Sequence, residues 1–459
     1  MDLELKIKNF GPIDEANIRV GPFTVFAGPN STGKTFVSKM LYSMLRARNA
    51  NHALVFFDVA TLGIKLGLQL LEQRGGVVEE RPLSAIRRGL QKIESILREA
   101  FPSDQVHNEL DKLSAVQPKL MAEVEKIRVH FQSLKKNIKT KEERPTAPLS
   151  EIHVNFESAI DDLESNLRDV KWTIGLGWHF KVLQNVLGNF QASDFSNLKG
   201  NGDSALYFSV EGVGELQETE EGFGFSPDRQ IVQNMQSFPE SFYLDSPLYW
   251  KLKSPLESIK RDSYSPSGAS LNGVPDYFYD MAVALRLRRK SVEHPRVEHP
   301  FAGIHEGLHN AIGGQISLNE AGDLEFHEKG KSIALSLTSA GVANMGMLAL
   351  LIERGALEQG SFLFIDEPES NLHPAWQVEM AAFLFELARQ GVNVVISTHS
   401  MTILKWLEVH VKEKPEDREL VKLNKFPPDA EWNDDMDAVM AEVKQSLTKP
   451  YSDLYIKGL

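Results

Sequence analysis

One short loop constrains this chain more than any other feature of its sequence. Residues 28–35, Gly-Pro-Asn-Ser-Thr-Gly-Lys-Thr, fit the pattern G-x-x-x-x-G-K-[ST]. The loop stands between an apolar run, Phe23–Phe26, and a stretch whose apolar residues recur at helical spacing. Such a loop wraps backbone amides around a phosphate, and the following helix presents its positive end. The residues expected to contact ATP here are Gly28, Asn30, Ser31, Thr32, Gly33, Lys34 and Thr35.

A second motif supplies carboxylates for the same site. The apolar run Phe362–Ile365 ends in Asp366 and Glu367, and a buried parallel strand presents such residues at its carboxyl end, where ligands bind. We expect Lys34 to reach the β- and γ-phosphates, and Thr35 and Asp366 to bind Mg²⁺. Glu367 is expected to act as the general base for water. Strands often end in acids, so the upstream loop is what favours the catalytic interpretation.

Two further segments complete the predicted site. The strand-like run Val392–Thr398 is followed by His399, which we expect beside the γ-phosphate as a second catalytic residue. Ser339 and Gly341 precede an apolar helix, whose amino end can bind an anion. An ordinary helix cap is the alternative interpretation of the same residues.

The middle of the chain is helical and polar. Apolar residues recur at steps of four and three over 120–138 and again over 152–174, with a polar turn at 139–150. This spacing predicts an antiparallel helical hairpin with arms of about 20 residues, roughly 30 Å long. The expected domains are 1–60 and 204–400 for the two parts of an α/β core, 61–203 for a helical insertion, and 401–459 for a helical C-terminal extension.

Composition limits the classes of protein that fit these motifs. The 459 residues include no cysteine, which removes disulfides, thiolate metal sites and cysteine nucleophiles. The net charge of −13 excludes a protein coated in basic charge, although it leaves room for a local basic groove. We find no secretory signal and no uninterrupted apolar stretch of about 18 residues, and therefore expect a cytoplasmic protein without a membrane segment.

Together, the motifs resemble those of ATP-binding-cassette (ABC) ATPases of the structural-maintenance-of-chromosomes (SMC) and OLD (overcoming lysogenization defect) type. The resemblance lies in IKNFGPI, VFAGPNSTGKT, SLTSAG, FLFIDEPESNLHP and VVISTHS, which occur in the family's order. It implies an α/β fold of the ABC ATPase head type, a mixed sheet with a P-loop core, interrupted by the helical hairpin. It also implies that Ser339 and Gly341 form a signature motif that contacts ATP bound to a second subunit, in a head-to-head homodimer. Ser370–His373 would be the D-loop, and the Q-loop is expected after Phe242–Leu244.

Departures from the family narrow the implied function. The signature is not L-S-G-G-Q, which disfavours transport, and the insertion is far shorter than an SMC coiled coil. Only residues 400–459 follow His399, too few for a Toprim nuclease. The architecture resembles stand-alone ATPases of bacterial anti-phage defence, the AriA ATPase of PARIS-like systems first and Septu-like systems next. The resemblance implies a separate effector partner, such as a nuclease.

Two other features leave different functions open. Residues 305–309, His-Glu-Gly-Leu-His, match H-E-x-x-H, with Glu320 or Glu325 as a third zinc ligand, but we prefer a polar helix because the match is short.

Basic residues gather over 126–144 and 286–290, where they could bind nucleic acid, although a solvated helix face is the preferred explanation. The rival functions are a DNA-repair ATPase that uses the basic hairpin and a scaffold that binds ATP with little turnover.

Overall fold

The chain forms two compact units. The computed structural model describes residues 2–73, 80–102, 108–141, 147–220, 222–228, 240–245, 249–250, 252, 256, 273–286, 300–320 and 322–457. The first unit, here the sheet unit, comprises Met1–Arg46, Gln184–Gly224 and Phe238–Leu459. The second, here the helical unit, comprises Ala47–Leu183 and Phe225–Ser237. All the predicted site residues belong to the sheet unit.

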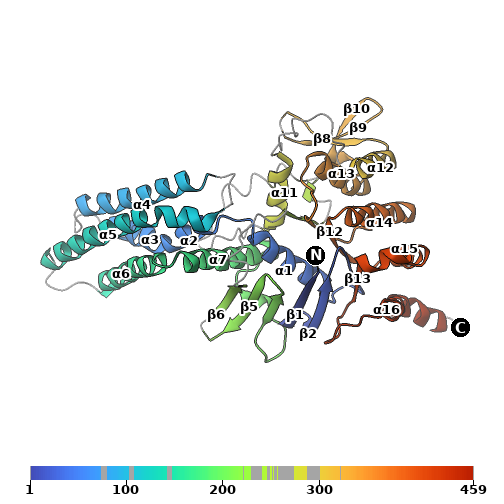
Figure 1. The fold of residues 1–459 in the computed structure, drawn as a ribbon, viewed down its shortest axis with the longest axis horizontal. Helices are drawn as coiled ribbons and strands as arrows, with labels where there is room; N and C mark the ends of the chain where they lie inside the picture. The colour runs from blue at the N-terminus through green and yellow to red at the C-terminus, as the bar shows by residue number, and fades with distance from the viewer. Residues whose placement is uncertain are drawn as a thin grey trace. The chain divides into compact units, whose positions relative to one another are not determined.

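A five-stranded parallel sheet lies at the centre of the sheet unit (Figure 1). Its strand order is β13-β3-β12-β11-β7. The strands are β3 (Phe23–Ala27), β7 (Ser241–Leu244), β11 (Phe362–Asp366), β12 (Asn393–Thr398) and β13 (Val421–Lys425). The inner strands β3, β12 and β11 are almost wholly buried, as strands covered on both faces are. The strands predicted at 23–26, 362–365 and 392–398 are thereby confirmed, together with the α/β fold class.

Helices connect these strands and place the candidate loops at one edge of the sheet. They are α1 (Lys34–Ala47), α13 (Ala340–Glu353), α14 (Pro374–Arg389), α15 (Met401–Glu413) and α16 (Met436–Lys457). The helices α14, α15 and α16 pack in succession (Figure 1). Because all five strands are parallel, the loops that follow β3, β11 and β12 meet at their common carboxyl end.

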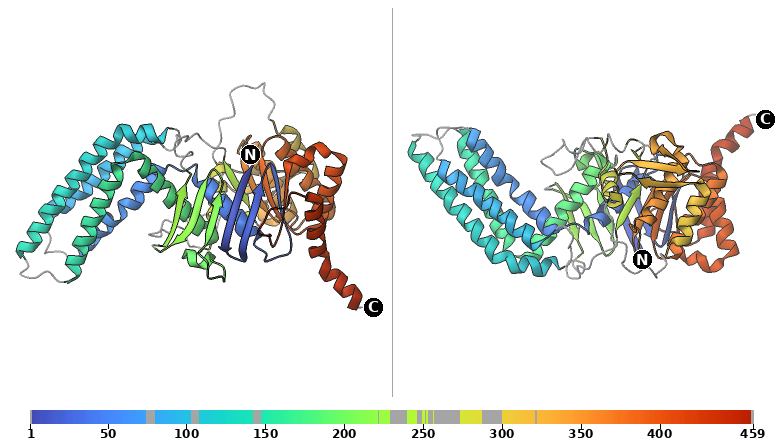
Figure 2. Two further views of the ribbon diagram at one scale, coloured as in Figure 1. Left: turned by 60° about the horizontal axis from the view of Figure 1, so that its bottom comes forward. Right: turned by 90° about the horizontal axis from the view of Figure 1, so that it is seen from above.

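Two antiparallel sheets flank this core. One has the order β2-β1-β4-β5-β6, and its strands lie side by side in Figure 2. They are β1 (Leu3–Phe10), β2 (Ile13–Val20), β4 (Tyr207–Val210), β5 (Gly214–Thr219) and β6 (Gly222–Pro227). The other sheet is β10-β9-β8, with β8 (Gln315–Leu318), β9 (Leu324–Glu328) and β10 (Lys331–Ala334). Leu318 pairs with Leu324, so β8 and β9 form an antiparallel hairpin.

The sheet unit also contains shorter helical elements. These are the helices α11 (Asp276–Arg286) and α12 (Ala302–Ile312) and the 3₁₀ turns Phe195–Leu198, Leu335–Leu337 and Pro415–Leu420. Helix α12 packs on α13 and α14.

The helical unit is larger than the predicted hairpin. Its helices are α2 (His52–Ala60), α3 (Leu62–Gln73), α4 (Glu80–Ala100), α5 (Glu109–Lys141), α6 (Ala147–Leu167) and α7 (Val170–Phe190), the last of which crosses into the sheet unit. One hydrophobic core joins side chains from all of these helices. The stretch His52–Glu72 is long and apolar enough to cross a membrane by length and composition, and its buried residues belong to this core. The expected two-helix arrangement is therefore one part of a multi-helix bundle.

The second arm of the predicted hairpin is broken, which the heptad-like spacing did not reveal. Helix α6 ends at Leu167, and α7 begins at Val170. The Asp169 carboxylate accepts hydrogen bonds from the backbone N–H groups of Lys171 and Trp172, and so caps the new helix. Gln117 Nε2 donates to the Leu167 carbonyl at 2.7 Å, which satisfies an end carbonyl of α6. The turn predicted at 139–150 is shorter in the structure, because residues 139–141 end α5 and residues 147–150 begin α6, while residues 142–146 lie outside the described residues.

The C-terminal extension, expected to be helical over 401–459, contributes a strand to the central sheet. Val421–Lys425 forms β13, which pairs in parallel with β3 at the sheet's edge. The stretch is short and carries two lysines, so its alternation of buried Val421 and Leu423 is a weak signal. Residues that follow β13 therefore lie beside those that follow β3.

Candidate functional site

The loop between β3 and α1 has a backbone that only glycine permits at two points. Gly33 has a φ of +99°. A Cβ on Gly28 would lie 2.1 Å from the Phe426 carbonyl oxygen, so the backbone that follows β13 packs directly against this glycine. Thr32 Oγ1 donates to the Pro29 carbonyl at 2.8 Å and closes the turn. The loop thus has the curled form that the motif predicts.

Lys34 is the buried cation of this loop. Its side chain is inside the protein, with the residue 5% exposed, and Nζ donates to the carbonyls of Gly28 at 2.9 Å and Pro29 at 2.6 Å. Burial lowers the pKa of Lys34, and the nearby carboxylates, Asp366 and Glu367 among them, oppose that effect. The ammonium is therefore held beside the acids of β11, as the two motifs together predict.

Thr35 connects the loop to β11. Its Oγ1 donates a hydrogen bond to Asp366 Oδ2 at 2.7 Å. Asn30 and Ser31 form the exposed tip of the loop, where Ser31 has a φ of +65°. The structure therefore brings the expected Mg²⁺ ligands, Thr35 and Asp366, into direct contact, although 331 residues separate them.

The Asp366 carboxylate has the features of a cation ligand. Its Oδ1 is buried and has no hydrogen-bond partner among the described residues. Burial raises the pKa of Asp366 to about 6, and repulsion from Asp245 adds to this, while the Thr35 hydrogen bond opposes it. Hard oxygen atoms such as those of Asp366 and Thr35 are the ligands that Mg²⁺ prefers, so the residues present fit this ion.

Asp245 is a residue of this site that the sequence analysis missed. It follows β7, whose Leu244 pairs with Ile365, so Asp245 lies beside Asp366 at the sheet's edge. The Asp245 carboxylate accepts a short hydrogen bond from the Tyr277 hydroxyl and lies 3.7 Å from Lys39 Nζ. The position is where we expected the Q-loop, and the signal available in the sequence was an acid directly after an apolar strand.

Glu367 stands in a strained backbone conformation. Its φ is +51°, which residues other than glycine seldom adopt. The Glu367 N–H donates to the Ser397 carbonyl at 2.8 Å, and the Ser370 hydroxyl donates to Glu367 Oε2 at 3.0 Å. The side chain is 40% exposed. These contacts hold the carboxylate at the sheet's edge, where water can reach it.

His399 lies beside two carboxylates. Its Nδ1 is 3.3 Å from Glu367 Oε1 and 3.5 Å from Glu369 Oε1. The structure therefore brings both predicted catalytic residues together. Glu369 was missed, although it is the second glutamate in the Asp-Glu-Pro-Glu run after the apolar strand.

Ser339 and Gly341 occupy the amino end of α13. Ser339 is the N-cap, and its side chain accepts a hydrogen bond from the Val342 N–H at 3.2 Å. A Cβ on Gly341 would lie 2.9 Å from Leu372 Cδ2 and 3.0 Å from the Asn371 carbonyl oxygen. The simple cap is thus present, and Gly341 packs against the expected D-loop. A contact of Ser339 with a nucleotide remains a prediction.

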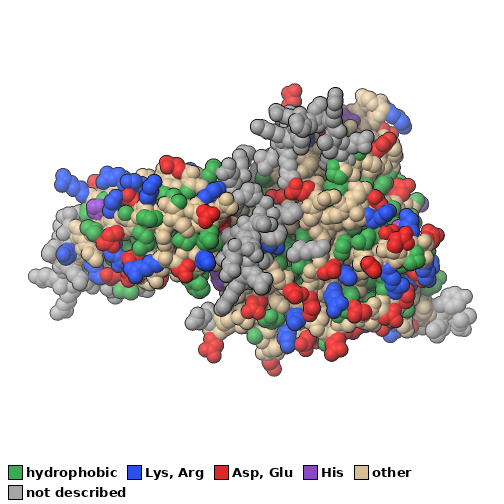
Figure 3. Space-filling model, in the orientation of Figure 1, with side chains coloured by type: hydrophobic (Ala, Val, Ile, Leu, Met, Phe, Trp, Pro, Cys, Tyr) green, Lys and Arg blue, Asp and Glu red, His purple; other side chains and the backbone are tan. Residues whose placement is uncertain are grey.

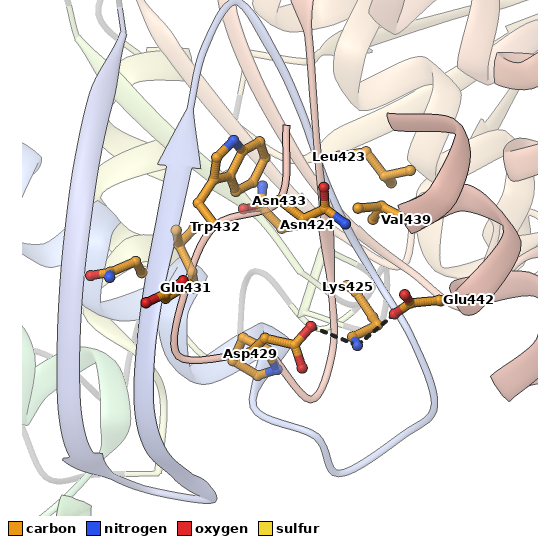
Figure 4. A pocket seen from close by; sticks show the side chains of 12 residues that line it. Leu423, Asn424, Lys425, Asp429, Glu431, Trp432, Asn433, Val439 and Glu442 are labelled. Atoms are coloured by element: carbon orange, nitrogen blue, oxygen red, sulfur yellow. Dashed lines mark hydrogen bonds and ion pairs between the residues drawn. The ribbon is translucent and has the colours of Figure 1, made fainter. Parts of the chain in front are cut away.

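A separate hollow lies beside β13 and does not favour phosphates. Figure 4 shows Lys425 between Asp429 and Glu442, with Nζ 2.7 Å from an oxygen of each. The Arg19 guanidinium lies over the Trp432 ring, 5.8 Å from its centroid. Because two carboxylates offset the Lys425 charge, we assign no anion to this hollow.

The H-E-x-x-H segment lies on α12, where His305 Nε2 is 4.0 Å from Glu353 Oε2. His305 and His309 stand on α12 with ring centroids 4.1 Å apart. Glu325 accepts hydrogen bonds from Asn319 and Ser332 instead of approaching them. Within the described ranges, no three His, Asp or Glu side chains form a group that could hold a metal ion.

The described basic residues of the helical unit are largely paired with acids. Arg128 contacts Asp161 and Glu164 at 2.5 Å each. Lys126 lies 2.8 Å from Glu123, and Lys135 lies 2.5 Å from Glu157. Figure 3 shows blue and red side chains interspersed on the visible face of this unit. Lys136 is exposed. The side chains of the other basic residues of both clusters are not described; they are those of Lys139, Lys141, Arg144, Arg286, Arg288, Arg289 and Lys290.

Comparison with known proteins identifies similarity to ATPases. Residues 246–405 match the family described as "AAA domain, putative AbiEii toxin, Type IV TA system". This match covers less than half of the chain and includes Ser339, Asp366, Glu367 and His399. No curated protein matches the chain.

Solved structures similar to the chain include SMC head domains. The SMC head domain from Thermotoga maritima is 13% identical, with a TM-score of 0.32 over 88% of this chain and 92% of that one. An SMC head bound to the C-winged helix domain of ScpA is 12% identical, with a TM-score of 0.33 over 88% and 90%. A head from Pyrococcus furiosus, bound to the C-terminal domain of ScpA, is 11% identical, with a TM-score of 0.29 over 91% and 100%.

Proposed function

We propose that the protein binds ATP with Mg²⁺ and hydrolyses ATP to ADP and phosphate. The observation that carries this proposal is the 2.7 Å hydrogen bond from Thr35 Oγ1 to Asp366 Oδ2, which joins the two motifs. Lys34 and the amino end of α1 supply positive charge for the phosphates. The match of residues 246–405 to AAA-type domains supports the same function.

Each residue of the proposed site has a separate role in hydrolysis. Bound Mg²⁺ would neutralise phosphate charge, and the oxygens of Thr35 and Asp366 would hold it. Lys34 orients the β- and γ-phosphates, and Glu367 accepts a proton from the attacking water. His399, whose ring lies beside Glu367, contacts the γ-phosphate. The strained backbone at Glu367 keeps its carboxylate in place for this step.

We further propose that ATP closes a head-to-head homodimer and that hydrolysis reopens it. In that dimer, Ser339 and Gly341 contact ATP bound to the partner subunit. The neighbouring Leu337 is 79% exposed, an unusual state for a large apolar side chain beside a candidate interface. The dimer's motion would control a separate effector, such as a nuclease, in cytoplasmic anti-phage defence of the PARIS-like (AriA) kind.

Two rival functions use the same pocket differently. A DNA-repair ATPase would use the basic hairpin, but the ion pairs of Lys126, Arg128 and Lys135 reduce the charge available for phosphates. A scaffold would bind ATP and turn it over slowly. The first rival predicts salt-sensitive DNA binding, and the second predicts ATP binding without phosphate release.

Phosphate release by the purified full chain tests the proposal. Wild type should hydrolyse ATP only with Mg²⁺, and Lys34→Ala should lose ATP binding. Glu367→Gln should bind ATP and stay in a closed assembly, seen by native mass spectrometry. Normal turnover in Glu367→Gln would remove the role given to that carboxylate, and no turnover in wild type would favour the scaffold.

A further inference from the structure

A buried carboxylate outside the predicted site contacts its histidine. Glu369 lies in the loop after β11, and its side chain is 5% exposed. Its Oε1 accepts hydrogen bonds from the Thr398 hydroxyl at 2.7 Å and from the His399 backbone N–H at 2.9 Å. Its Oε2 is buried and has no hydrogen-bond partner among the described residues. Such a carboxylate is costly unless a donor or a positive charge lies near it.

The imidazole of His399 lies beside this carboxylate, and its Nδ1 is likewise buried without a hydrogen-bond partner among the described residues. Its Nδ1 faces the carboxylates of Glu367 and Glu369, at 3.3 Å and 3.5 Å. A carboxylate oxygen accepts hydrogen bonds, so these two neighbours favour the tautomer in which the facing nitrogen carries the proton. Nε2, on the other side of the ring, is then the atom left for a substrate.

The two carboxylates differ in their freedom to move. Glu367 is 40% exposed, whereas Glu369 is buried and fixed by the hydroxyl of Thr398 and the backbone of His399. Burial lowers the pKa of Lys34, and Glu369 is one of the three carboxylates that oppose this effect. Its charge therefore acts on the phosphate-binding lysine as well as on the histidine.

We propose that Glu369 is a positioning residue, which holds His399 with Nδ1 protonated and Nε2 available to the γ-phosphate. This rests on the ATPase activity proposed above. With Glu369 as the fixed partner of Nδ1, Glu367 is free to turn from His399 toward the attacking water. The pair works as a carboxylate–histidine unit, in which the carboxylate sets the orientation and tautomer of the ring.

A purely structural role for Glu369 makes a different prediction. In that case, the hydrogen bonds that Glu369 accepts from Thr398 and His399 would only stabilise the backbone at the end of β12. Glu369→Gln separates the two roles, because the amide oxygen still accepts both hydrogen bonds and only the charge is lost. Thr398→Val does the reverse, because it keeps the charge and removes the hydroxyl that donates to Glu369 and accepts from the Ser400 N–H. Glu379→Gln, on the exposed side of α14, is the matched control.

Single-turnover phosphate release and ATP affinity, measured on the full chain, test the proposal. Glu369→Gln should lower the hydrolysis rate at saturating ATP about 10- to 100-fold, the usual cost of removing such a partner, with the melting temperature unchanged. ATP affinity reports separately on the effect of the lost charge on Lys34. In a His399→Ala background, the same substitution should cost little more, because the two residues act as one unit.

Three results would overturn the inference. They are a wild-type rate in Glu369→Gln, a rate in Thr398→Val lower than that in Glu369→Gln, and a full multiplicative loss in the His399→Ala background. Absence of hydrolysis in wild type would instead refute the proposed ATPase activity itself.

Discussion

Asp366→Asn is expected to make the protein more stable at neutral pH while abolishing Mg²⁺-dependent hydrolysis. Burial raises the pKa of Asp366 from 3.8 to about 6, with a further contribution from Asp245. The folded chain therefore holds this proton more tightly than the unfolded chain does. By linkage, the free energy of unfolding falls as the pH rises from 3.8 to about 6, and the full penalty persists above that interval.

The size of the effect follows from the change in pKa. A rise from 3.8 to about 6 corresponds to roughly 3 kcal/mol, at about 1.36 kcal/mol for each pH unit. Because the residue as a whole is only partly buried, solvent screening makes this an upper value. Asparagine keeps an oxygen that accepts the Thr35 hydrogen bond and carries no charge, so it removes the penalty without removing the contact.

Thermal unfolding in EDTA at pH 5 and pH 8 measures the effect. Asp366→Asn should melt a few degrees above wild type at pH 8. The difference in melting temperature should be smaller at pH 5, where Asp366 of the folded wild type is largely protonated. The exposed Asp14→Asn is the control and should melt with wild type at both pH values. An asparagine variant that is less stable at pH 8, or a gap that does not change with pH, would refute the reasoning.

Four other substitutions test particular contacts. Gly28→Ala puts a Cβ 2.1 Å from the Phe426 carbonyl oxygen and should weaken ATP binding on the order of 10- to 100-fold, measured with a fluorescent nucleotide. Ser339→Ala removes the cap of α13, at a cost of about 1 kcal/mol in urea unfolding, and should lower turnover without loss of ATP binding. Leu163→Ala opens a cavity in the helical unit and should cost about 2–5 kcal/mol of its unfolding free energy. His52→Leu removes the ring nitrogen that lies 3.0 Å from Glu109 Oε2, while the backbone N–H of residue 52 still donates to Oε1, so it should cost about 1–3 kcal/mol, seen as early loss of far-UV circular dichroism.

Local chemistry made the loop and the inner strands predictable from sequence. The form of the phosphate loop depends on backbone freedom at Gly28 and Gly33, which residue type alone reveals. The run Phe362–Ile365 is apolar throughout because both faces of β11 are covered, and that pattern is also local. The pairing of Thr35 with Asp366 could be expected because parallel strands end at one edge.

Features that depend on distant neighbours were missed. The strand β13 is recognisable mainly from its pairing with β3, since Val421 and Leu423 alternate with polar residues over only five positions. The break between α6 and α7 depends on Asp169 as a cap, whereas the apolar spacing continues across it. In the same way, an acid after an apolar strand is common in sequences. Asp245 can be assigned to the site only because β7 pairs with β11, which places Asp245 beside Asp366.

The loop after β11 combines crowded negative charge with a strained backbone in a partly buried place. Asp366, Glu367 and Glu369 lie within four residues, and all three raise the pKa of Lys34 against its burial. Such crowding of negative charge is unfavourable in a partly buried place, and a positive φ at Glu367 adds strain. Lys34 and Lys39 offset only part of that charge, so the arrangement is best stabilised by a divalent cation with its phosphates. We therefore expect the loop's stability to depend on its ligand, and this dependence is what would couple nucleotide binding to the rest of the chain.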